Sequence, residues 1–150
     1  MKFRAFLSIV AILFASAGWA AYRQEPPARP QPNPNWDYTE LGKAPEKYRS
    51  KANPLENDPE AIAAGGILFE EHCQECHGEK GVGGKKAPSL RSEEVQSATP
   101  GTLFWILSNG VVRKGMPVWS KLPEPQRWQI IRYVKSLGKL PAPESSAAKP

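Results

Sequence analysis

The sequence has few of the residues that usually build metal and redox sites. Its 150 residues include only two cysteines, two histidines and two methionines. A structural zinc site needs about four nitrogen or sulfur ligands, and the four candidates are bunched together between residues 72 and 77. Such crowding gives poor tetrahedral geometry. A zinc site is therefore disfavoured, although a metal site and a redox dithiol stay open as alternatives.

The sequence also lacks the alternation of polar and apolar residues that predicts β-strands. A thioredoxin-like dithiol lies between a strand and a helix of a βαβ unit, and no such unit is predicted here. Basic residues interleaved with aromatic ones are absent as well. The formal charge of +5 falls to +3 (5 − 2) once Lys2 and Arg4 are set aside. We therefore predict an all-α fold and no binding to nucleic acids.

Residues 1–21 are predicted to be a signal peptide or an N-terminal membrane anchor. Lys2 and Arg4 give the segment a positive start, no acid occurs in it, and an almost wholly apolar run follows. Small residues near its end suit cleavage by signal peptidase, whereas Trp19 and Tyr22 suit an uncleaved anchor at the membrane interface. In both cases we expect the remaining chain in the periplasm or on the extracytoplasmic face of the inner membrane. No cysteine directly follows the run, which argues against a lipoprotein anchor.

The two cysteines lie in the stretch Cys73-Gln74-Glu75-Cys76-His77, which has the form C-x-x-C-H. This is an attachment motif for haem c. Each thiol adds across one vinyl group of the porphyrin, and the spacing lets one helical turn place both sulfurs along one edge of the ring. The imidazole of His77 then reaches the iron as an axial ligand. The motif predicts one covalently bound haem c, and the adjacent His72 is expected to be solvated and to point away from the iron.

Met116 is the one methionine besides Met1, and it lies in the loop Lys114-Gly115-Met116-Pro117. A lone methionine often fills a gap in a hydrophobic core, but a loop between glycine and proline is poorly placed for such packing. Pro117 restricts the backbone, and a thioether is a suitable ligand for haem iron. We predict that His77 and Met116 are the two metal ligands, with a lysine as the alternative to Met116.

The globular domain is predicted to span residues 58–140. Residues 22–57 before it are rich in proline and poor in aliphatic side chains, so we expect an extended linker. Its inner aromatic residues are Trp36, Tyr38 and Tyr48. They either pack loosely on the domain surface or form a docking segment for a partner. Residues 141–150 are expected to be a disordered tail.

Three main helices are predicted within the domain, and the first leads directly into the haem motif. The predicted helices are residues 59–73, 100–109 and 125–137. Asp58 and Thr99 are suitable N-caps for the first two. Gly65 and Gly66 each cost about 1 kcal/mol in a helix interior. Two glycines in succession therefore indicate that another helix crosses closely there.

Taken together, these features resemble the class I cytochromes c over about residues 59–140. As in that family, Gly65 and Phe69 precede the haem motif at a four-residue step, and Ile130 and Tyr133 stand where the last helix contacts them. The resemblance implies an all-α cytochrome c fold, with three main helices wrapped around one covalently bound haem.

The resemblance also assigns residues around the cofactor. It implies that the carbonyl of Pro88 accepts a hydrogen bond from the ligand histidine, which orients the ring. Leu90 follows shortly after and is counted with the same site, although Ala87 stands where glycine is commoner in the family. The predicted cofactor-binding residues are Cys73, Cys76, His77, Pro88, Leu90 and Met116.

The predicted function is that of a mono-haem electron carrier rather than an enzyme. An iron with both axial positions filled is suited to one-electron transfer between redox proteins. The alternative is a haem-bearing subunit of a membrane oxidase or dehydrogenase complex, which a proline-rich tether would suit. A haem enzyme or gas sensor is less favoured, because it needs an open iron position that Met116 fills.

Overall fold

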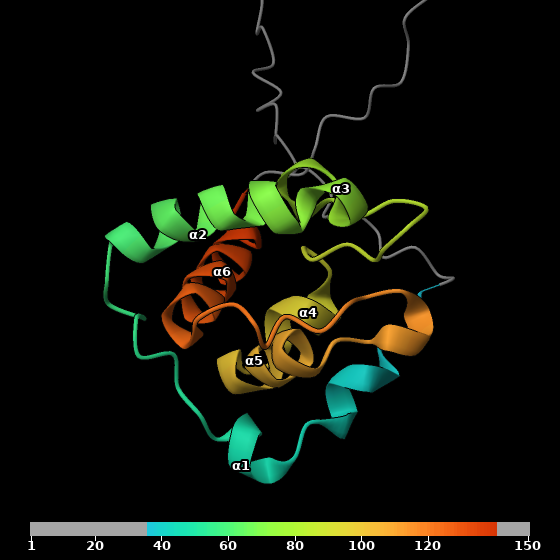
Figure 1. Cartoon of the computed structure of the whole chain (residues 1–150), viewed down its shortest axis with the longest axis horizontal. Helices are drawn as coiled ribbons and strands as arrows, with labels where there is room; N and C mark the ends of the chain where they lie inside the picture. Colours follow the sequence, from blue (N-terminus) through green and yellow to red (C-terminus); the bar gives the residue numbers. More distant parts are fainter. Residues whose placement is uncertain (1–35, 141–150) are drawn as a thin grey trace, which may run out of the picture.

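The computed structural model describes residues 36–140, and this part of the chain is helical (Figure 1). The elements in chain order are η1 (Thr39–Lys43), α1 (Glu46–Arg49), α2 (Glu60–His72), α3 (Gln74–His77), η2 (Glu79–Gly81), α4 (Glu93–Ser97), α5 (Pro100–Asn109), η3 (Val112–Lys114) and α6 (Glu124–Leu137). Between residues 36 and 140 there is no β-strand, and only an isolated antiparallel bridge joins Val111 and Met116. The prediction of an all-α fold is confirmed, and the longest helices, α2, α5 and α6, lie where three main helices were predicted.

The predicted targeting segment (1–21), the first part of the predicted linker (22–35) and the predicted tail (141–150) lie outside the described residues. The predictions for these segments stay predictions. None of the helices between residues 36 and 140 has both the length and the apolar character needed to cross a membrane.

The first main helix, α2, crosses over α6 (Figure 1). It begins at Glu60, whose backbone N–H donates to the Asp58 carboxylate at 2.9 Å. Gly65 is buried at the crossing, and a Cβ there would lie 2.0 Å from the backbone oxygen of Gln129 in α6. The two helices can approach this closely only because Gly65 has no side chain. The close crossing predicted from the paired glycines is confirmed.

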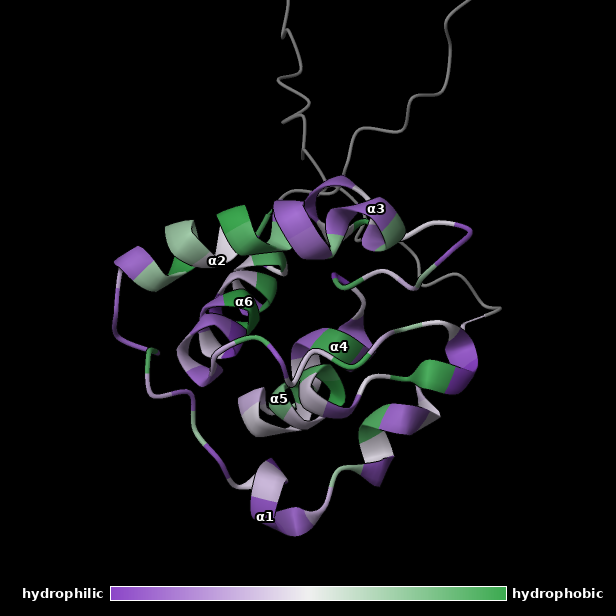
Figure 2. Cartoon of the chain, viewed as in Figure 1, coloured by the Kyte–Doolittle hydropathy of each residue, from purple (hydrophilic) through white to green (hydrophobic). Residues whose placement is uncertain are grey.

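A hydrophobic core fills the space between α2, α5 and α6. The rings of Phe104 and Trp128 stack with centroids 4.1 Å apart, and Phe69 contacts the Tyr133 ring at 5.2 Å, as the resemblance implied. The buried core residues are Phe69, Val95, Leu103, Phe104, Leu107, Trp128, Ile130, Ile131 and Val134. Figure 2 shows α2 as mainly apolar between polar ends, whereas polar and apolar residues are interspersed along α6, the pattern of a helix with one buried face. This packing fixes the C-terminal end of α2, where the haem motif begins.

The N-terminal part of the described chain differs from the expected extended linker. Its helical turns η1 and α1 lie beside α5. A Cβ at Gly101 would lie 1.8 Å from the Tyr48 backbone oxygen, so the chain passes directly over the start of α5. Ala44 is 1 % exposed, and Tyr38 and Leu41 pack against the core. The composition of the segment does not reveal this packing, because only a few of its side chains are buried and most of the others are polar or proline.

Asn53 joins the same segment to α6 through a buried hydrogen bond. Its buried amide donates to the Trp128 carbonyl at 3.0 Å, and its Oδ1 accepts from the Leu55 N–H at 2.8 Å. Asn53→Ala removes both hydrogen bonds from a buried site, so we expect the free energy of unfolding to fall by about 1–3 kcal/mol. Denaturant unfolding would be measured beside Asn57→Ala, whose side chain is exposed. Equal midpoints for the two variants would contradict the expectation.

Candidate functional site

A cavity of about 370 Å³ lies between the end of α2, α5, α6 and the loops that join them. All the residues predicted to bind a cofactor line it, and they come from three separate stretches of the chain. These residues are Cys73, Cys76, His77, Pro88, Leu90 and Met116. Much of the remaining wall is apolar and is formed by Phe69, Val95, Leu103, Leu107, Ile130, Ile131 and Val134. The fold therefore gathers the predicted site residues around one hydrophobic space.

The C-x-x-C-H stretch forms the short helix α3, which follows α2 after a change of direction at Cys73 (Figure 1). Cys73 ends α2 and begins α3, with a non-helical φ of −122°. The N–H groups of Cys76 and His77 donate to the Cys73 carbonyl at 3.2 and 3.0 Å. One helical turn thus holds both cysteines and the histidine at the edge of the cavity.

The surroundings of Cys73 do not favour a reactive thiolate at that position. Cys73 is half-buried, and burial raises the pKa of its thiol to about 12, with the neighbouring Cys76 adding to the shift. Reactive and metal-binding cysteines instead have a lowered pKa, because the thiolate is the active form. In the described part of the chain, no group of three or more His, Cys, Asp or Glu side chains is arranged to hold a metal ion.

His77 lies in the cavity wall, and the loop that follows it holds the ring. Its Nδ1 lies 3.0 Å from the Pro88 carbonyl oxygen, which is the hydrogen bond that the resemblance implied. Because a carbonyl only accepts, Nδ1 carries the proton and Nε2 keeps a lone pair. Burial lowers the pKa of the His77 ring, and the hydrogen bond to Pro88 opposes this only in part. The ring is therefore neutral at pH 7, with the tautomer that can ligate a metal through Nε2.

Met116 is held by a tight loop between α5 and α6. Its backbone pairs with Val111 through hydrogen bonds of 3.0 and 3.2 Å, and η3 lies between the two residues. Beyond it, the Trp119 N–H donates to the Leu107 carbonyl of α5 at 3.1 Å. The Met116 side chain is half-buried, packs against the core and lines the cavity. The loop therefore gives the thioether a fixed place in the cavity wall.

Two parts of the cavity wall were not predicted from the sequence. Trp36, Tyr38 and Leu41 line it although they precede the predicted domain. His72, expected to be solvated, lies against the Trp119 ring with centroids 5.4 Å apart and also lines the cavity. The aromatic residues Trp36 and Tyr38, in an otherwise polar stretch, were the sequence signal for this N-terminal part of the wall. No sequence signal indicated the place of His72, because its neighbour Trp119 is distant along the chain.

The chemistry of the cavity fits haem c. Its mainly apolar wall suits a porphyrin, a neutral imidazole and a thioether are ligands of haem iron, and two free cysteines lie at its edge. The hydroxyl of Tyr38 is buried and has no hydrogen-bond partner among residues 36–140. Buried polar groups are nearly always hydrogen-bonded in folded proteins, so this hydroxyl is available to a polar group of a bound molecule.

Comparisons with known proteins agree with the site. Residues 60–134 match the family model described as cytochrome C oxidase, cbb3-type, subunit III. The chain is 34 % identical over 94 residues to the quinohemoprotein alcohol dehydrogenase ADH-IIG of Pseudomonas putida, over 61 % of this chain and 12 % of that protein. It is 30 % identical over 98 residues to the cbb3-type cytochrome c oxidase subunit CcoP of Rubrivivax gelatinosus, over 64 % of this chain and 32 % of that protein. The chain thus spans less than a third of each relative.

The family match runs from the start of α2 into α6 and covers half of the 150-residue chain. It includes the haem motif and the Met116 loop, and it agrees with the observed helical fold. Relatives of this kind confirm both the resemblance to class I cytochromes and the prediction of covalent haem c. The chain therefore belongs to the family of subunit III of cbb3-type cytochrome c oxidases, within the class I c-type cytochromes, and is an electron-transfer protein that bears haem c.

Proposed function

We propose that this chain carries single electrons between redox proteins outside the cytoplasm, with one haem c in the cavity lined by Met116 and His77. The observation that carries the proposal is the geometry of His77, whose Nδ1–H donates to the Pro88 carbonyl, so that Nε2 keeps the lone pair that can bind iron. When bound, haem c supplies an iron that gains and loses one electron. The protein supplies the ligands, the apolar surroundings and the orientation.

In this proposal the α3 turn holds the cofactor and the following loop orients its first ligand. Cys73 and Cys76 would hold the porphyrin through thioether bonds, and His77 would bind the iron through Nε2. The Pro88 carbonyl keeps the imidazole in place, because such outer hydrogen bonds fix the tautomer and rotation of a ligand histidine. Leu90, whose N–H donates to the Gly81 carbonyl at 2.8 Å, contributes an aliphatic side chain that keeps water from the cavity.

Met116 would be the second protein ligand of the iron in this proposal. Its thioether lines the same cavity as His77, and its backbone pairing with Val111 limits how far the loop can move. With His77 and Met116 both bound to it, the iron would be suited to electron transfer and would have no open position for a substrate or a gas. This supports a carrier over a haem enzyme or a gas sensor.

The proposed haem-binding domain extends over residues 36–140 rather than 58–140. Support comes from η1 and α1, which lie beside α5, and from Trp36 and Tyr38, which reach the cavity. The segment that would tether the domain to a membrane is then limited to residues before 36. With residues 1–21 as a signal peptide or anchor, the proposed location is the periplasm or the outer face of the inner membrane.

A second candidate function is a fixed subunit of a membrane oxidase or dehydrogenase complex. The similarity to a cbb3-type oxidase subunit and to a quinohemoprotein dehydrogenase supports it, because in both relatives the matched stretch is one part of a longer protein. The redox partner would then be another part of the same complex. Release of the protein from cells without detergent favours the free carrier, whereas retention with an oxidase or dehydrogenase after detergent extraction favours the subunit.

Mass spectrometry of the mature protein tests the covalent cofactor. We expect a mass that exceeds the polypeptide by one haem, and no thiol that reacts with alkylating reagents, because Cys73 and Cys76 are the only cysteines. Denatured protein should also keep its colour in acidified organic solvent. Extraction of the colour into the solvent, or two reactive thiols in the coloured protein, would contradict the attachment. The same spectrum reports whether residues 1–21 have been removed.

A further inference from the structure

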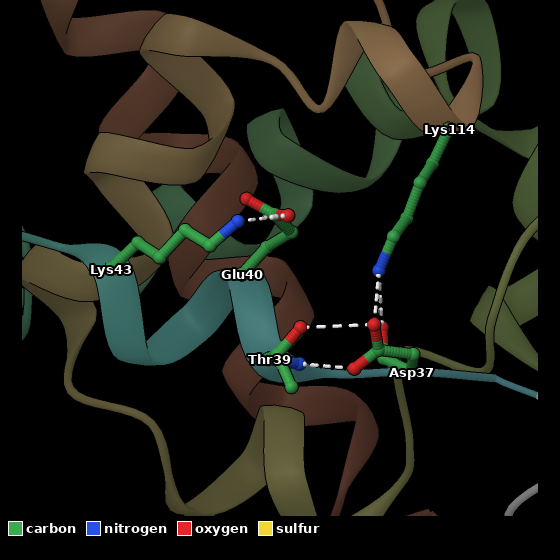
Figure 3. A network of polar contacts seen from close by, with 5 residues as sticks. All are labelled: Asp37, Thr39, Glu40, Lys43 and Lys114. Atoms are coloured by element: carbon green, nitrogen blue, oxygen red, sulfur yellow. Dashed lines mark hydrogen bonds and ion pairs between the residues drawn. The ribbon is translucent and has the colours of Figure 1, made fainter.

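Residues 36–41, here called the strap, line the cavity and form hydrogen bonds with two of the loops around it. At one end, Trp36 Nε1 donates to the Gly84 carbonyl at 3.3 Å, in the loop between His77 and Pro88. Further along, Lys114 Nζ donates to the Asp37 carboxylate at 2.8 Å and to its backbone carbonyl at 3.1 Å (Figure 3). The strap therefore links the loop that orients His77 to the loop that carries Met116.

Two hydrogen bonds from Thr39 hold the Asp37 carboxylate in the orientation in which it contacts Lys114. Its Oδ1 accepts from the Thr39 N–H at 2.8 Å and its Oδ2 from the Thr39 hydroxyl at 2.9 Å. Figure 3 shows Asp37 between Thr39 of the strap and Lys114 of the opposite loop, while Glu40 points to Lys43 instead. The hydrogen bond from Lys114, followed by those from Thr39, holds the pKa of the Asp37 carboxyl well below its usual range. The Asp37 carboxylate is therefore charged throughout the neutral pH range.

Tyr38 directly follows these two contacts along the chain. Its side chain packs against the core, and the residue forms part of the cavity wall. The hydroxyl is buried, and none of the residues described by the structure hydrogen-bonds to it. A buried water would need about two to four polar partners, which a mainly apolar wall does not offer. A porphyrin is apolar except for its two carboxylates, which are strong acceptors for a phenolic O–H.

We propose that the strap is a haem-binding element, in which the Tyr38 hydroxyl donates a hydrogen bond to a haem carboxylate and Asp37 ties the strap to the Met116 loop. The inference rests on the proposed function, because it takes the cavity as the haem site and Met116 as an iron ligand. It adds residues that precede the matched family region, which begins at residue 60. Tyr38 is a cofactor-binding residue in this proposal, and Asp37 is a positioning residue that acts through Lys114.

Tyr38→Phe in the haem-loaded full chain tests the first contact, with Tyr48→Phe as the matched control. Both variants lose a hydroxyl from the same N-terminal segment, but Tyr48 lies outside the cavity lining. Infrared difference spectra between oxidised and reduced protein report the haem carboxylates. We expect their stretching bands to shift in Tyr38→Phe and to match the parent in Tyr48→Phe. Unshifted bands in Tyr38→Phe, with haem retained, would mean that Tyr38 does not bind the cofactor and would overturn that contact.

Asp37→Asn tests the second contact, with Glu46→Gln as the control. Each variant loses one carboxylate from an exposed ion pair, since Glu46 pairs with Arg49 at 3.2 Å. Imidazole binding to the oxidised protein requires the Met116 loop to open, so we expect binding to be about two- to fivefold faster in Asp37→Asn at low salt. The difference should shrink near 1 M salt, where the Debye length is about 3 Å. Equal rates of imidazole binding in both variants would show that the contact between Asp37 and Lys114 does not hold the Met116 loop.

These outcomes are distinct from failure of the proposed function. If the parent protein lacks covalent haem, or its oxidised spectrum lacks the sulfur-to-iron charge-transfer band, the assignment of Met116 fails before any strap variant is compared. If the parent has both features and neither strap variant differs from its control, the site stands and the strap proposal is wrong.

Discussion

Replacing Met116 with alanine is expected to open the sixth iron position and to lower the reduction potential. The potential should fall by a sizeable part of the about 0.8 V that axial ligands span, because a thioether favours Fe(II) over a harder oxygen ligand. The weak red band that arises from sulfur-to-iron charge transfer should vanish, and the reduced variant should bind carbon monoxide. The parent protein should not respond to carbon monoxide. The thioether bonds and His77 are untouched, so haem should be retained.

Met116→Leu separates ligation from packing at the same position. Leucine keeps nearly the volume of methionine, so the half-buried place beside the core stays filled. If the sulfur is the ligand, the leucine variant should lose the band and lower the potential as much as the alanine variant does. A leucine variant with the parent's spectrum and potential would contradict ligation by Met116. The carrier proposal would then lose its main argument against an enzyme or a sensor.

Gly65→Ala is expected to destabilise the protein by about 3 kcal/mol, near the upper end of the usual cost of overpacking. The new Cβ would lie 2.0 Å from the backbone oxygen of Gln129 and 2.5 Å from its carbonyl carbon, so α2 and α6 must move apart. A main-chain carbonyl inside a helix cannot rotate away as a side chain could. For a domain of this size the midpoint of thermal unfolding should fall by roughly 12–24 °C.

Gly66→Ala is the matched control for this variant. A Cβ at Gly66 would meet only the Tyr133 ring, at 3.3 Å, and alanine gains up to about 1 kcal/mol over glycine in helix propensity. We expect its stability to stay within about 1 kcal/mol of the parent. Thermal unfolding of both haem-loaded variants, followed by far-ultraviolet circular dichroism, gives the comparison. Similar midpoints for the two variants would show that the crossing tolerates a methyl group at Gly65.

The sequence by itself determined the cofactor, the fold class and the positions of the main helices. Attachment of haem depends on a local spacing, because Cys73, Cys76 and His77 need only one helical turn to reach the same ring. Caps are local as well: the Thr102 N–H donates to the Thr99 hydroxyl at 3.2 Å, and α5 begins at Pro100 as predicted. The glycine pair indicated the helix crossing because its cost in a helix interior requires a compensating contact.

Only the tertiary structure decided where the N-terminal segment goes. Its proline content and polar surface predict an extended linker, yet its few buried side chains pack on α5 and on the cavity. The deciding contacts join distant residues: Asp37 with Lys114, Trp36 with Gly84, and Asn53 with Trp128. Each depends on a surface that forms only when α5, α6 and the loops are assembled. Local composition cannot encode such partners, and so the strap and the buried Tyr38 hydroxyl emerged from the folded chain alone.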